Sequence, residues 1–119
     1  MSPPLSVLMS VYNGDRYLAR SLESVLAQTF QDFEFIIADD RSTDTTADIL
    51  RAFADRDRRI RIVTGSRNGL GLVRNLLIRE ASAPLIAWLD SDDVAYPTRL
   101  EKQVALMMQN PDLVGAGTS

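Results

Sequence analysis

Short apolar runs alternate with amphipathic segments along this chain. The runs are rich in Val, Ile, Leu and Phe, which is typical of buried strands; they span residues 5–11, 33–38, 60–63 and 85–89. The segments between and after them place apolar residues at helical spacing; they span residues 15–28, 44–54, 72–81 and 97–110. A last apolar run, "LVGAG", begins at Leu113 and is typical of the start of a fifth strand.

Polar and glycine residues mark the ends of these segments. Asn13, followed by glycine, predicts a turn after the first strand. Asp15 and Asp44 are suitable N-caps for the first two helices, and Pro97 suits the first turn of the last helix.

The alternation of strands and helices predicts an α/β fold. Strands separated by helices form a parallel sheet through right-handed crossovers. We therefore expect a Rossmann-like, mostly parallel sheet with helices on both faces. No repeat or linker divides the sequence, so residues 1–119 are expected to form one domain.

Polar clusters follow three of the four predicted strands. They are "SVYNG" after the first strand, "DD" after the second and "DSDD" after the fourth. In open α/β sheets, ligands bind at the edge where the strands end. Residues far apart in sequence are thus expected to meet in one crevice.

The segment "DSDD" carries three carboxylates, Asp90, Asp92 and Asp93. In an extended backbone, Asp90 and Asp92 would point the same way, because strand side chains alternate. A divalent cation would then offset their repulsion. The alternative is a solvated loop with acidic caps for the next helix, although capping requires only one Asp.

The other clusters are less specific. Asp39 and Asp40 follow a buried strand, where a carboxylate can accept hydrogen bonds from a base or a ribose, or serve only as a loop acid. The ring of Tyr12 can stack on a planar base or simply pack in the protein.

A glycine-bearing loop, "TGSRNGLG", precedes the third helix. Glycines before a helix N-terminus let the backbone approach a phosphate, and Arg74 could contact a diphosphate or remain exposed. The dinucleotide fingerprint is absent, because Arg74 occupies the place of the third glycine after Gly69 and Gly71. A P-loop is excluded too, since no GK[ST] occurs.

Composition narrows the chemistry. A net charge of −3 argues against nucleic acid as a partner. The chain has no Cys and no His, so any metal must be held by oxygen ligands, as Mg²⁺, Mn²⁺ or Ca²⁺ would be. No signal peptide or apolar run of membrane-spanning length occurs. The chain is expected to be cytoplasmic, and a longer protein containing it could still be peripheral to a membrane.

These motifs together resemble family 2 glycosyltransferases, which have the GT-A fold. The resemblance begins with "PLSVLMSVYNGDRYLARSLESVLAQTFQDFEFIIADDRSTDTT" and continues through "NGLGLVRN" and "WLDSDDVAYPTRLEKQV". It covers nearly the whole chain in collinear order. It implies transfer of a sugar from a nucleotide-diphosphate donor, with a UDP-sugar favoured, usually with inversion and with Mg²⁺ or Mn²⁺.

The resemblance also implies residue roles. Val11 and Tyr12 would cradle the base, Asp40 would hydrogen-bond it, and "DSDD" matches the family's DxD motif. The residues implied to bind the nucleotide sugar are Ser10, Val11, Tyr12, Asp39, Asp40, Asn68, Arg74 and Asp90. The residues implied to bind the metal are Asp90, Asp92 and Asp93, and which of them touches the ion is open.

One part of the family pattern is missing. The general base of the family, an Asp or Glu, and the acceptor-binding half lie downstream of the DxD motif, and here they would lie beyond Ser119. The chain is therefore expected to be a truncated transferase that binds a nucleotide but does not transfer sugar, and its acceptor is unknown. An edge or apolar face exposed by truncation would favour a homodimer.

Two alternatives from other classes stay open. A nucleotidyltransferase would usually carry a glycine-rich, arginine-bearing loop after the first strand and a lysine in the site, and "SVYNGDRY" matches neither well. The other alternative is a non-catalytic module that binds a nucleotide, interacts with a partner or acts as a phosphate receiver. A receiver would place its acid pair after the first strand and its phosphoacceptor after the third. Here the acids follow the second and fourth.

Overall fold

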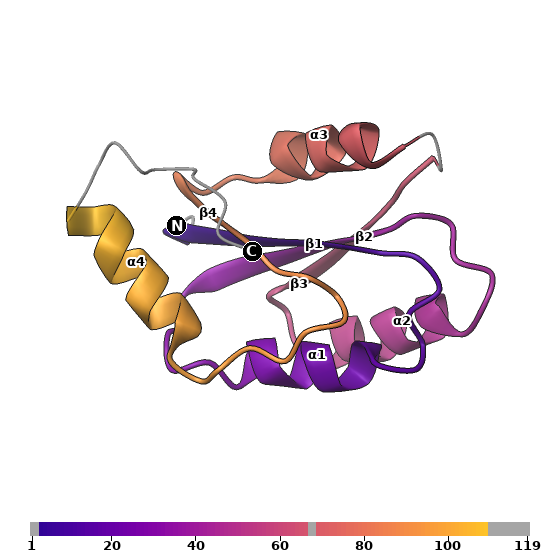
Figure 1. Ribbon diagram of the computed structural model, residues 1–119, viewed down its shortest axis with the longest axis horizontal. Helices are drawn as coiled ribbons and strands as arrows, with labels where there is room; N and C mark the ends of the chain where they lie inside the picture. Colours follow the sequence, from indigo (N-terminus) through magenta and orange to yellow (C-terminus); the bar gives the residue numbers. More distant parts are fainter. Residues whose placement is uncertain (1–2, 67–68, 110–119) are drawn as a thin grey trace.

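The computed structural model describes residues 3–66 and 69–109. Its strands, β1 to β4, are Leu5–Val11, Phe33–Asp39, Ile60–Thr64 and Leu85–Trp88. Its helices, α1 to α4, are Leu18–Leu26, Thr46–Arg56, Leu70–Glu80 and Arg99–Gln109. The strands form one parallel sheet in the order β3-β2-β1-β4 (Figure 1). The prediction of a Rossmann-like α/β fold is confirmed.

The sheet is centred on β1 and β2, which are its longest strands. Val7 pairs with Phe35 on one side and with Ala87 on the other. Both strands are almost entirely buried, because helices cover both faces of the sheet. This explains why their sequences are continuous apolar runs rather than alternating ones.

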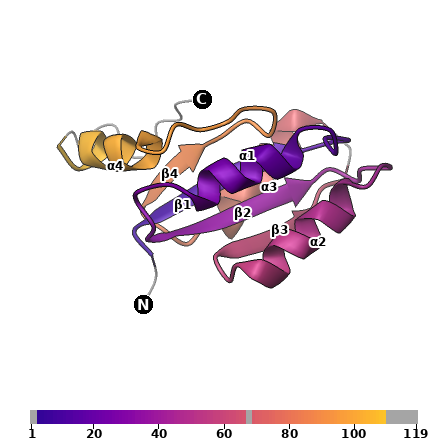
Figure 2. The ribbon, with the colours of Figure 1, turned by 90° about the horizontal axis from the view of Figure 1, so that it is seen from below.

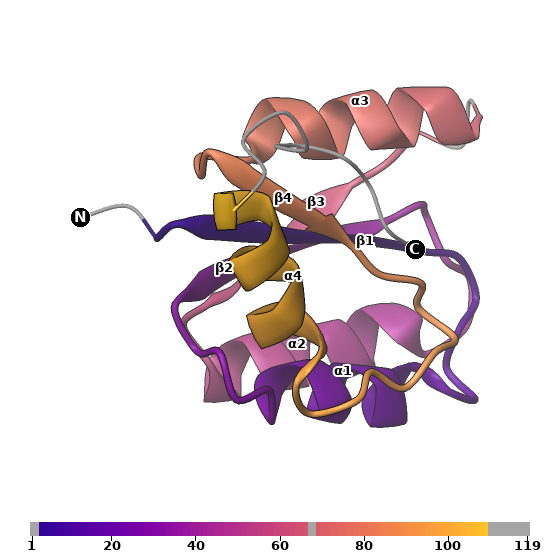
Figure 3. The ribbon, with the colours of Figure 1, turned by 60° about the vertical axis from the view of Figure 1, so that its left-hand side comes forward.

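The helices form two unequal layers. In Figure 1, α3 lies above the sheet, whereas α1 and α2 lie below it. Seen from below in Figure 2, α1 runs along the centre of the sheet and α2 lies beside it, on the side of β3. Figure 3 shows α4 between the level of the sheet and the level of α1. Leu100 and Met107 of α4 belong to the same buried cluster as the apolar residues of α1 and α2.

Strand alternation divides the core into two clusters. Val7, Met9 and Val11 of β1 face α1 and α2 in the larger cluster. Leu8 of β1 and Ile36 of β2 face α3 in a smaller cluster, whose other buried members are Ala38, Val73 and Leu77. Each residue of a strand therefore has a defined face, which fixes the direction of side chains near the strand ends.

The helices begin two or three residues away from the predicted starts. α1 begins at Leu18 rather than after a cap at Asp15, because the Asp15 carboxylate accepts hydrogen bonds from Thr45 instead. α3 begins earlier than predicted, at Leu70, after Gly69 adopts a φ of 116°. Asp44 does act near the start of α2, where its Oδ1 accepts the N–H of Thr46 at 2.9 Å. The predicted fifth strand lies outside the described residues.

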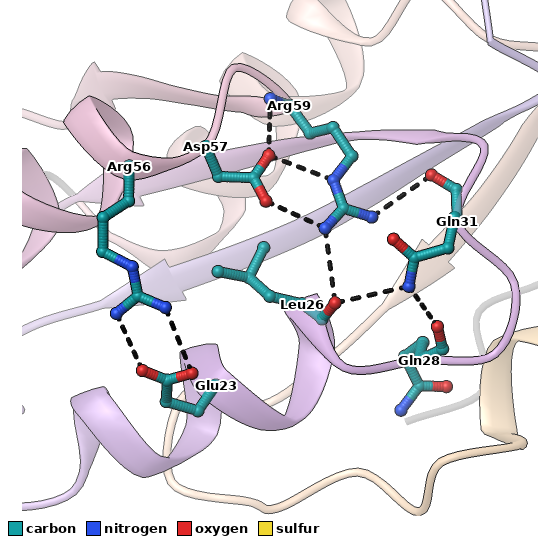
Figure 4. Close-up of polar contacts among 7 residues, drawn as sticks. All are labelled: Glu23, Leu26, Gln28, Gln31, Arg56, Asp57 and Arg59. Carbon is teal, nitrogen blue, oxygen red and sulfur yellow. Dashed lines mark hydrogen bonds and ion pairs between the residues drawn. The ribbon is translucent and has the colours of Figure 1, made fainter.

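The edge of the sheet where the strands begin, the amino edge, carries a network of paired charges. We call Glu23, Arg56, Asp57 and Arg59 the amino-edge network (Figure 4). Arg56 Nη1 and Nη2 donate to Glu23 at 2.8 and 3.3 Å. Arg59 Nε and Nη2 donate to Asp57 at 3.0 and 2.9 Å. These hydrogen bonds lower the pKa of both Glu23 and Asp57.

Arg59 ties the network to the rest of the fold. It donates to the carbonyl oxygens of Leu26 at 3.3 Å and Gln31 at 3.2 Å. Its guanidinium also lies 4.5 Å from the centre of the Phe33 ring. One side chain thus connects the end of α1, the start of β2 and the turn before β3.

Candidate functional site

The candidate site lies at the opposite edge of the sheet, the carboxyl edge, where the strands end. The connections that follow β1, β2 and β3 lie together on the right of Figure 1, and β4 ends toward the same side. Because β1 lies between β2 and β4, the segment after β1 is flanked by Asp40 on one side and Asp90 on the other. The expectation that these residues share one edge is met.

Backbone hydrogen bonds fix Asp40 between the ends of both neighbouring strands. Its N–H donates to the carbonyl of Val11 at 2.9 Å, and the N–H of Gly65 donates to the carbonyl of Asp39 at 2.9 Å. A Cβ placed on Gly65 would lie only 2.3 Å from Oδ1 of Asp40. Gly65 is therefore required for the position of the Asp40 carboxylate, a role that the sequence analysis did not identify.

The residues at the ends of β1 and β2 differ in burial and in hydrogen bonding. Asp39 is 9% exposed and its Oδ1 accepts the N–H of Ser42 at 3.0 Å, so it supports the loop after β2. Val11 is 3% exposed and packs in the core. Ser10 is half-buried, on the side of the sheet that α3 covers. Tyr12 is 41% exposed just after β1.

Asn13 links the loops after β1 and β2. Its backbone is left-handed, with a φ of 51°, which Asn tolerates better than most residues. Its Oδ1 accepts the N–H groups of Thr43 at 2.7 Å and Asp44 at 3.3 Å, and its own N–H donates to Ser42 at 2.9 Å. The Asn-Gly signal predicted the turn but not this connection, which fixes Tyr12 relative to the segment after Asp40.

Asp44 strengthens the same connection. Its Oδ2 accepts the N–H of Asp15 at 3.2 Å, while its Oδ1 accepts the N–H of Thr46. Desolvation acts to raise the pKa of Asp44, but the hydrogen bonds from Thr46 and Asp15 outweigh it and hold the pKa below its ordinary value. The carboxylate of Asp44 thus links the loop after β1 to the loop after β2.

Asp90, Asp92 and Asp93 form a group of exposed acids that we call the carboxylate cluster. Each offers an oxygen that lies within 4.8 Å of the oxygens of the other two. The backbone does not stay extended here, because the N–H of Asp93 bonds to the carbonyl of Asp90 at 3.3 Å. A turn, rather than strand alternation, therefore brings the three side chains together.

The loop that follows the carboxylate cluster is anchored to α1. Gln28 is 1% exposed; its Nε2 donates to the carbonyl of Tyr96 at 2.6 Å and its Oε1 accepts the N–H of Leu100 at 3.0 Å. The hydroxyl of Ser24 accepts the N–H of Ala95 at 2.9 Å. Buried hydrogen bonds thus fix both the loop and the first turn of α4.

The carboxylate cluster has the chemistry of a site for a hard divalent cation. Carboxylate oxygens are the ligands that Mg²⁺ and Mn²⁺ prefer. Within residues 3–66 and 69–109, none of the three acids forms an ion pair with a Lys or Arg side chain. A divalent cation held between them would offset their mutual repulsion.

Arg74 lies on the first turns of α3, over the end of β4. Its guanidinium carbon is 4.3 Å from the centre of the Trp88 ring, which is a cation–π contact. Asn68, the other residue expected near the base or the diphosphate, lies outside the described residues. Of the expected nucleotide-binding residues, the structure therefore describes all except Asn68.

Comparison with known proteins gives the family of this chain. Its residues 6–118 match the family model described as "Glycosyl transferase family 2". A Haemophilus influenzae protein named an uncharacterized glycosyltransferase is 38% identical over 91% of this chain and 44% of its own length. The Escherichia coli O-antigen biosynthesis glycosyltransferase WbnJ is 38% identical over 95% of this chain and 45% of its own length. The chain spans less than half of these relatives.

Solved structures agree with this result. S. aureus TarS 1-349 in complex with UDP-GlcNAc is 27% identical and has a TM-score of 0.81 over 93% of this chain and 32% of that one. The mannosyltransferase PcManGT from Pyrobaculum calidifontis, in complex with GDP-Man and Mn²⁺, is 23% identical with a TM-score of 0.80 over 90% of this chain and 33% of that one, and it supports the fold alone.

The fold and the edge site thus define an α/β protein of the GT-A type. This chain belongs to glycosyl transferase family 2. None of the helices in the described ranges has the length and apolar character needed to cross a membrane.

Proposed function

We propose that this chain forms the donor-binding part of a glycosyltransferase that uses a nucleotide-diphosphate sugar and a divalent cation. The observation that carries the proposal is the carboxylate cluster at the same sheet edge as Asp40 and Tyr12. A base can stack on an aromatic ring and donate a hydrogen bond to a fixed carboxylate, and a diphosphate can bind a cation. The relation to TarS, whose complexes contain UDP and UDP-GlcNAc, favours a UDP-sugar.

In this proposal, each group has a separate task. Tyr12 stacks on the base, and Asp40 accepts a hydrogen bond from a base N–H, with Asp39, Ser10 and Val11 forming the support beneath. Asn68 and Arg74 lie near the base or the diphosphate. This division places the neutral part of the ligand near β1 and β2 and its charged part near β4 and α3.

Asp90, Asp92 and Asp93 would hold Mg²⁺ or Mn²⁺. When bound, the ion stabilises negative charge on the diphosphate leaving group. The three carboxylates would hold the ion at the carboxyl edge, and Asp90, one residue after Leu89, would also contact the nucleotide sugar.

The full reaction is proposed to proceed with inversion. The acceptor hydroxyl oxygen forms a bond to the anomeric carbon, the bond from that carbon to the diphosphate oxygen breaks, and a general base takes the hydroxyl proton. Because the chain covers less than half of its curated relatives, we propose that the base and the acceptor site are supplied by the part of those proteins that this chain does not cover. The 119 residues alone would then bind the donor without transferring sugar.

The test is a calorimetric titration of the chain with UDP, with and without Mn²⁺. Mn²⁺ is expected to raise the affinity for UDP about tenfold or more, since the carboxylate cluster would hold the ion and the ion would attract the negatively charged diphosphate. Asp92→Asn should remove most of this gain. UDP affinity that is the same with and without Mn²⁺ would contradict the metal-assisted proposal and favour a simple nucleotide-binding module.

A matched control is available at the other end of the sheet. Asp32 is exposed directly before β2, at the amino edge. Asp32→Asn changes the net charge as Asp92→Asn does, and it should leave the effect of Mn²⁺ on UDP binding unchanged. If both variants weaken UDP binding equally, net charge rather than a local ion site is responsible.

A further inference from the structure

The contact between Arg74 and Trp88 joins α3 to the last residue of β4. Arg74 is exposed, whereas Trp88 is half-buried and packs against the cluster beneath α3. The guanidinium carbon lies 4.3 Å from the centre of the indole ring. An exposed arginine normally samples many rotamers, so a stacked one has lost much of this freedom before any ligand arrives.

The arginine contacts the strand that leads into the carboxylate cluster. Trp88 is opposite Leu8 of β1, and pairing with β1 continues through the N–H of Leu89, which donates to the carbonyl of Leu8 at 3.0 Å. A strand rises about 3.3 Å per residue, so the backbone of Asp90 follows that of Trp88 after about 7 Å. The contact between Arg74 and Trp88 is therefore two residues along the chain from the first of the acids that would hold a metal.

The contact also limits where the arginine can donate. The N–H groups of a guanidinium lie in one plane and point in fixed directions. A contact that restrains the guanidinium therefore also restrains the directions in which it can donate. The indole thus holds the positive charge at the end of β4, on the strand that leads into the carboxylate cluster.

We infer that Trp88 is a positioning residue that holds Arg74 for the diphosphate of the donor. The inference rests on the proposed function and adds a residue that the sequence analysis did not consider. The indole would not touch the ligand. It would act only through Arg74 and only on the charged part of the nucleotide.

The experiment compares UDP with uridine, both in the presence of Mn²⁺. In Trp88→Leu, the affinity for UDP is expected to fall about fivefold, because an unstacked Arg74 must be ordered on binding. The affinity for uridine, which has no phosphate, should change by less than about twofold. Trp88→Phe keeps a ring under the guanidinium and should retain most of the affinity for UDP.

A double-mutant cycle tests whether Trp88 acts through Arg74. Arg74→Gln should lower UDP affinity by a larger factor than Trp88→Leu does, and the double variant should be no weaker than Arg74→Gln alone. Additive losses would overturn the inference. Ile86→Ala is the matched control, since Ile86 is a half-buried residue of β4 that also packs against the cluster beneath α3.

The outcomes separate this inference from the proposed function. A wild-type chain that binds neither UDP nor uridine overturns the proposed function, and this inference with it. A wild-type chain that binds both, with equal losses for the two ligands in Trp88→Leu and Trp88→Phe, overturns the inference alone. Trp88 is the single tryptophan of the 119 residues, so its emission should also change in Arg74→Gln without ligand, as direct evidence of the stacked pair.

Discussion

The two edges of the sheet differ in whether their charged side chains are paired. At the amino edge, each member of the amino-edge network has an oppositely charged partner, and Arg59 also satisfies two carbonyl oxygens. At the carboxyl edge, three carboxylates lie within 4.8 Å of one another, with no Lys or Arg paired to them in the ranges described.

This difference separates the stabilising part of the molecule from the part proposed to bind a ligand. A paired charge lowers the free energy of the fold, whereas a cluster of like charges raises it. The amino edge joins α1, α2 and β3. At the carboxyl edge, buried anchors such as Gln28 hold the loop that carries the acids in place.

The largest effect on stability is expected at the amino edge. Arg59→Ala removes the hydrogen bonds to Asp57, Leu26 and Gln31 and the contact with Phe33. It should lower the free energy of unfolding by about 2–3 kcal/mol in urea denaturation.

The same variant also shows whether the amino edge takes part in ligand binding. Its affinity for UDP should stay within about twofold of the wild type. Arg58→Ala, at the exposed neighbouring residue, is the control and should change stability by less than about 0.5 kcal/mol. If Arg58→Ala and Arg59→Ala are equally destabilising, the network contributes nothing specific.

The next largest effect is expected where β3 meets Asp40. Gly65→Ala would place a Cβ 2.3 Å from Oδ1 of Asp40, so the carboxylate must rotate away. We expect UDP affinity to fall about tenfold, measured by calorimetry. In an Asp40→Ala background the same substitution should have little further effect, and a full additional loss would mean that Gly65 acts on the backbone instead.

A smaller effect of opposite sign is expected for the carboxylate cluster. Replacing Asp90, Asp92 and Asp93 together by Asn removes their repulsion, so the metal-free chain should gain about 0.5–1 kcal/mol in free energy of unfolding. Mn²⁺ should no longer raise its melting temperature. Glu23→Gln, which also removes negative charge but breaks the pair with Arg56, should destabilise the chain. A loss of stability in both variants would mean that the three carboxylates do not destabilise the metal-free chain.

The smallest effect is a change in acid sensitivity. Hydrogen bonds from Arg59 lower the pKa of Asp57 from its ordinary value of 3.8. The resulting stabilisation is complete above that value and is lost as the pH falls below it through the lowered pKa. Asp57→Asn should therefore lose less stability than the wild type over this acidic range, measured as urea midpoints against pH. If the urea midpoints of the two proteins change with pH in the same way, the pair between Asp57 and Arg59 does not contribute to acid sensitivity.

The order and type of the elements could be predicted from the sequence. The apolar runs identified all four strands of the described ranges, because strands buried on both faces have continuous apolar sequences. The residues at which the helices begin could not be predicted as well. Asp15 has the composition of a cap, but its carboxylate is used by Thr45 across the loops, and local sequence cannot show a partner 30 residues away.

The candidate site could be predicted only in part. Asp40 and the carboxylate cluster were expected at one edge because parallel strands all end on the same side. Gly65 and Trp88 were missed, because their importance lies in contacts with Asp40 and Arg74 from other elements. The convergence of the three acids was expected from an extended backbone and arises instead from a turn.

The sequence by itself determined the α/β pattern, the oxygen-only metal chemistry and the kinds of residue available for a ligand, because these depend on composition and on neighbours along the chain. The tertiary structure decided which charges are paired. Arg56 and Asp92 both lie in polar stretches of sequence, but the packing of α2 beside α1 brings Glu23, 33 residues away, to the first, whereas the turn after β4 surrounds the second with like charge.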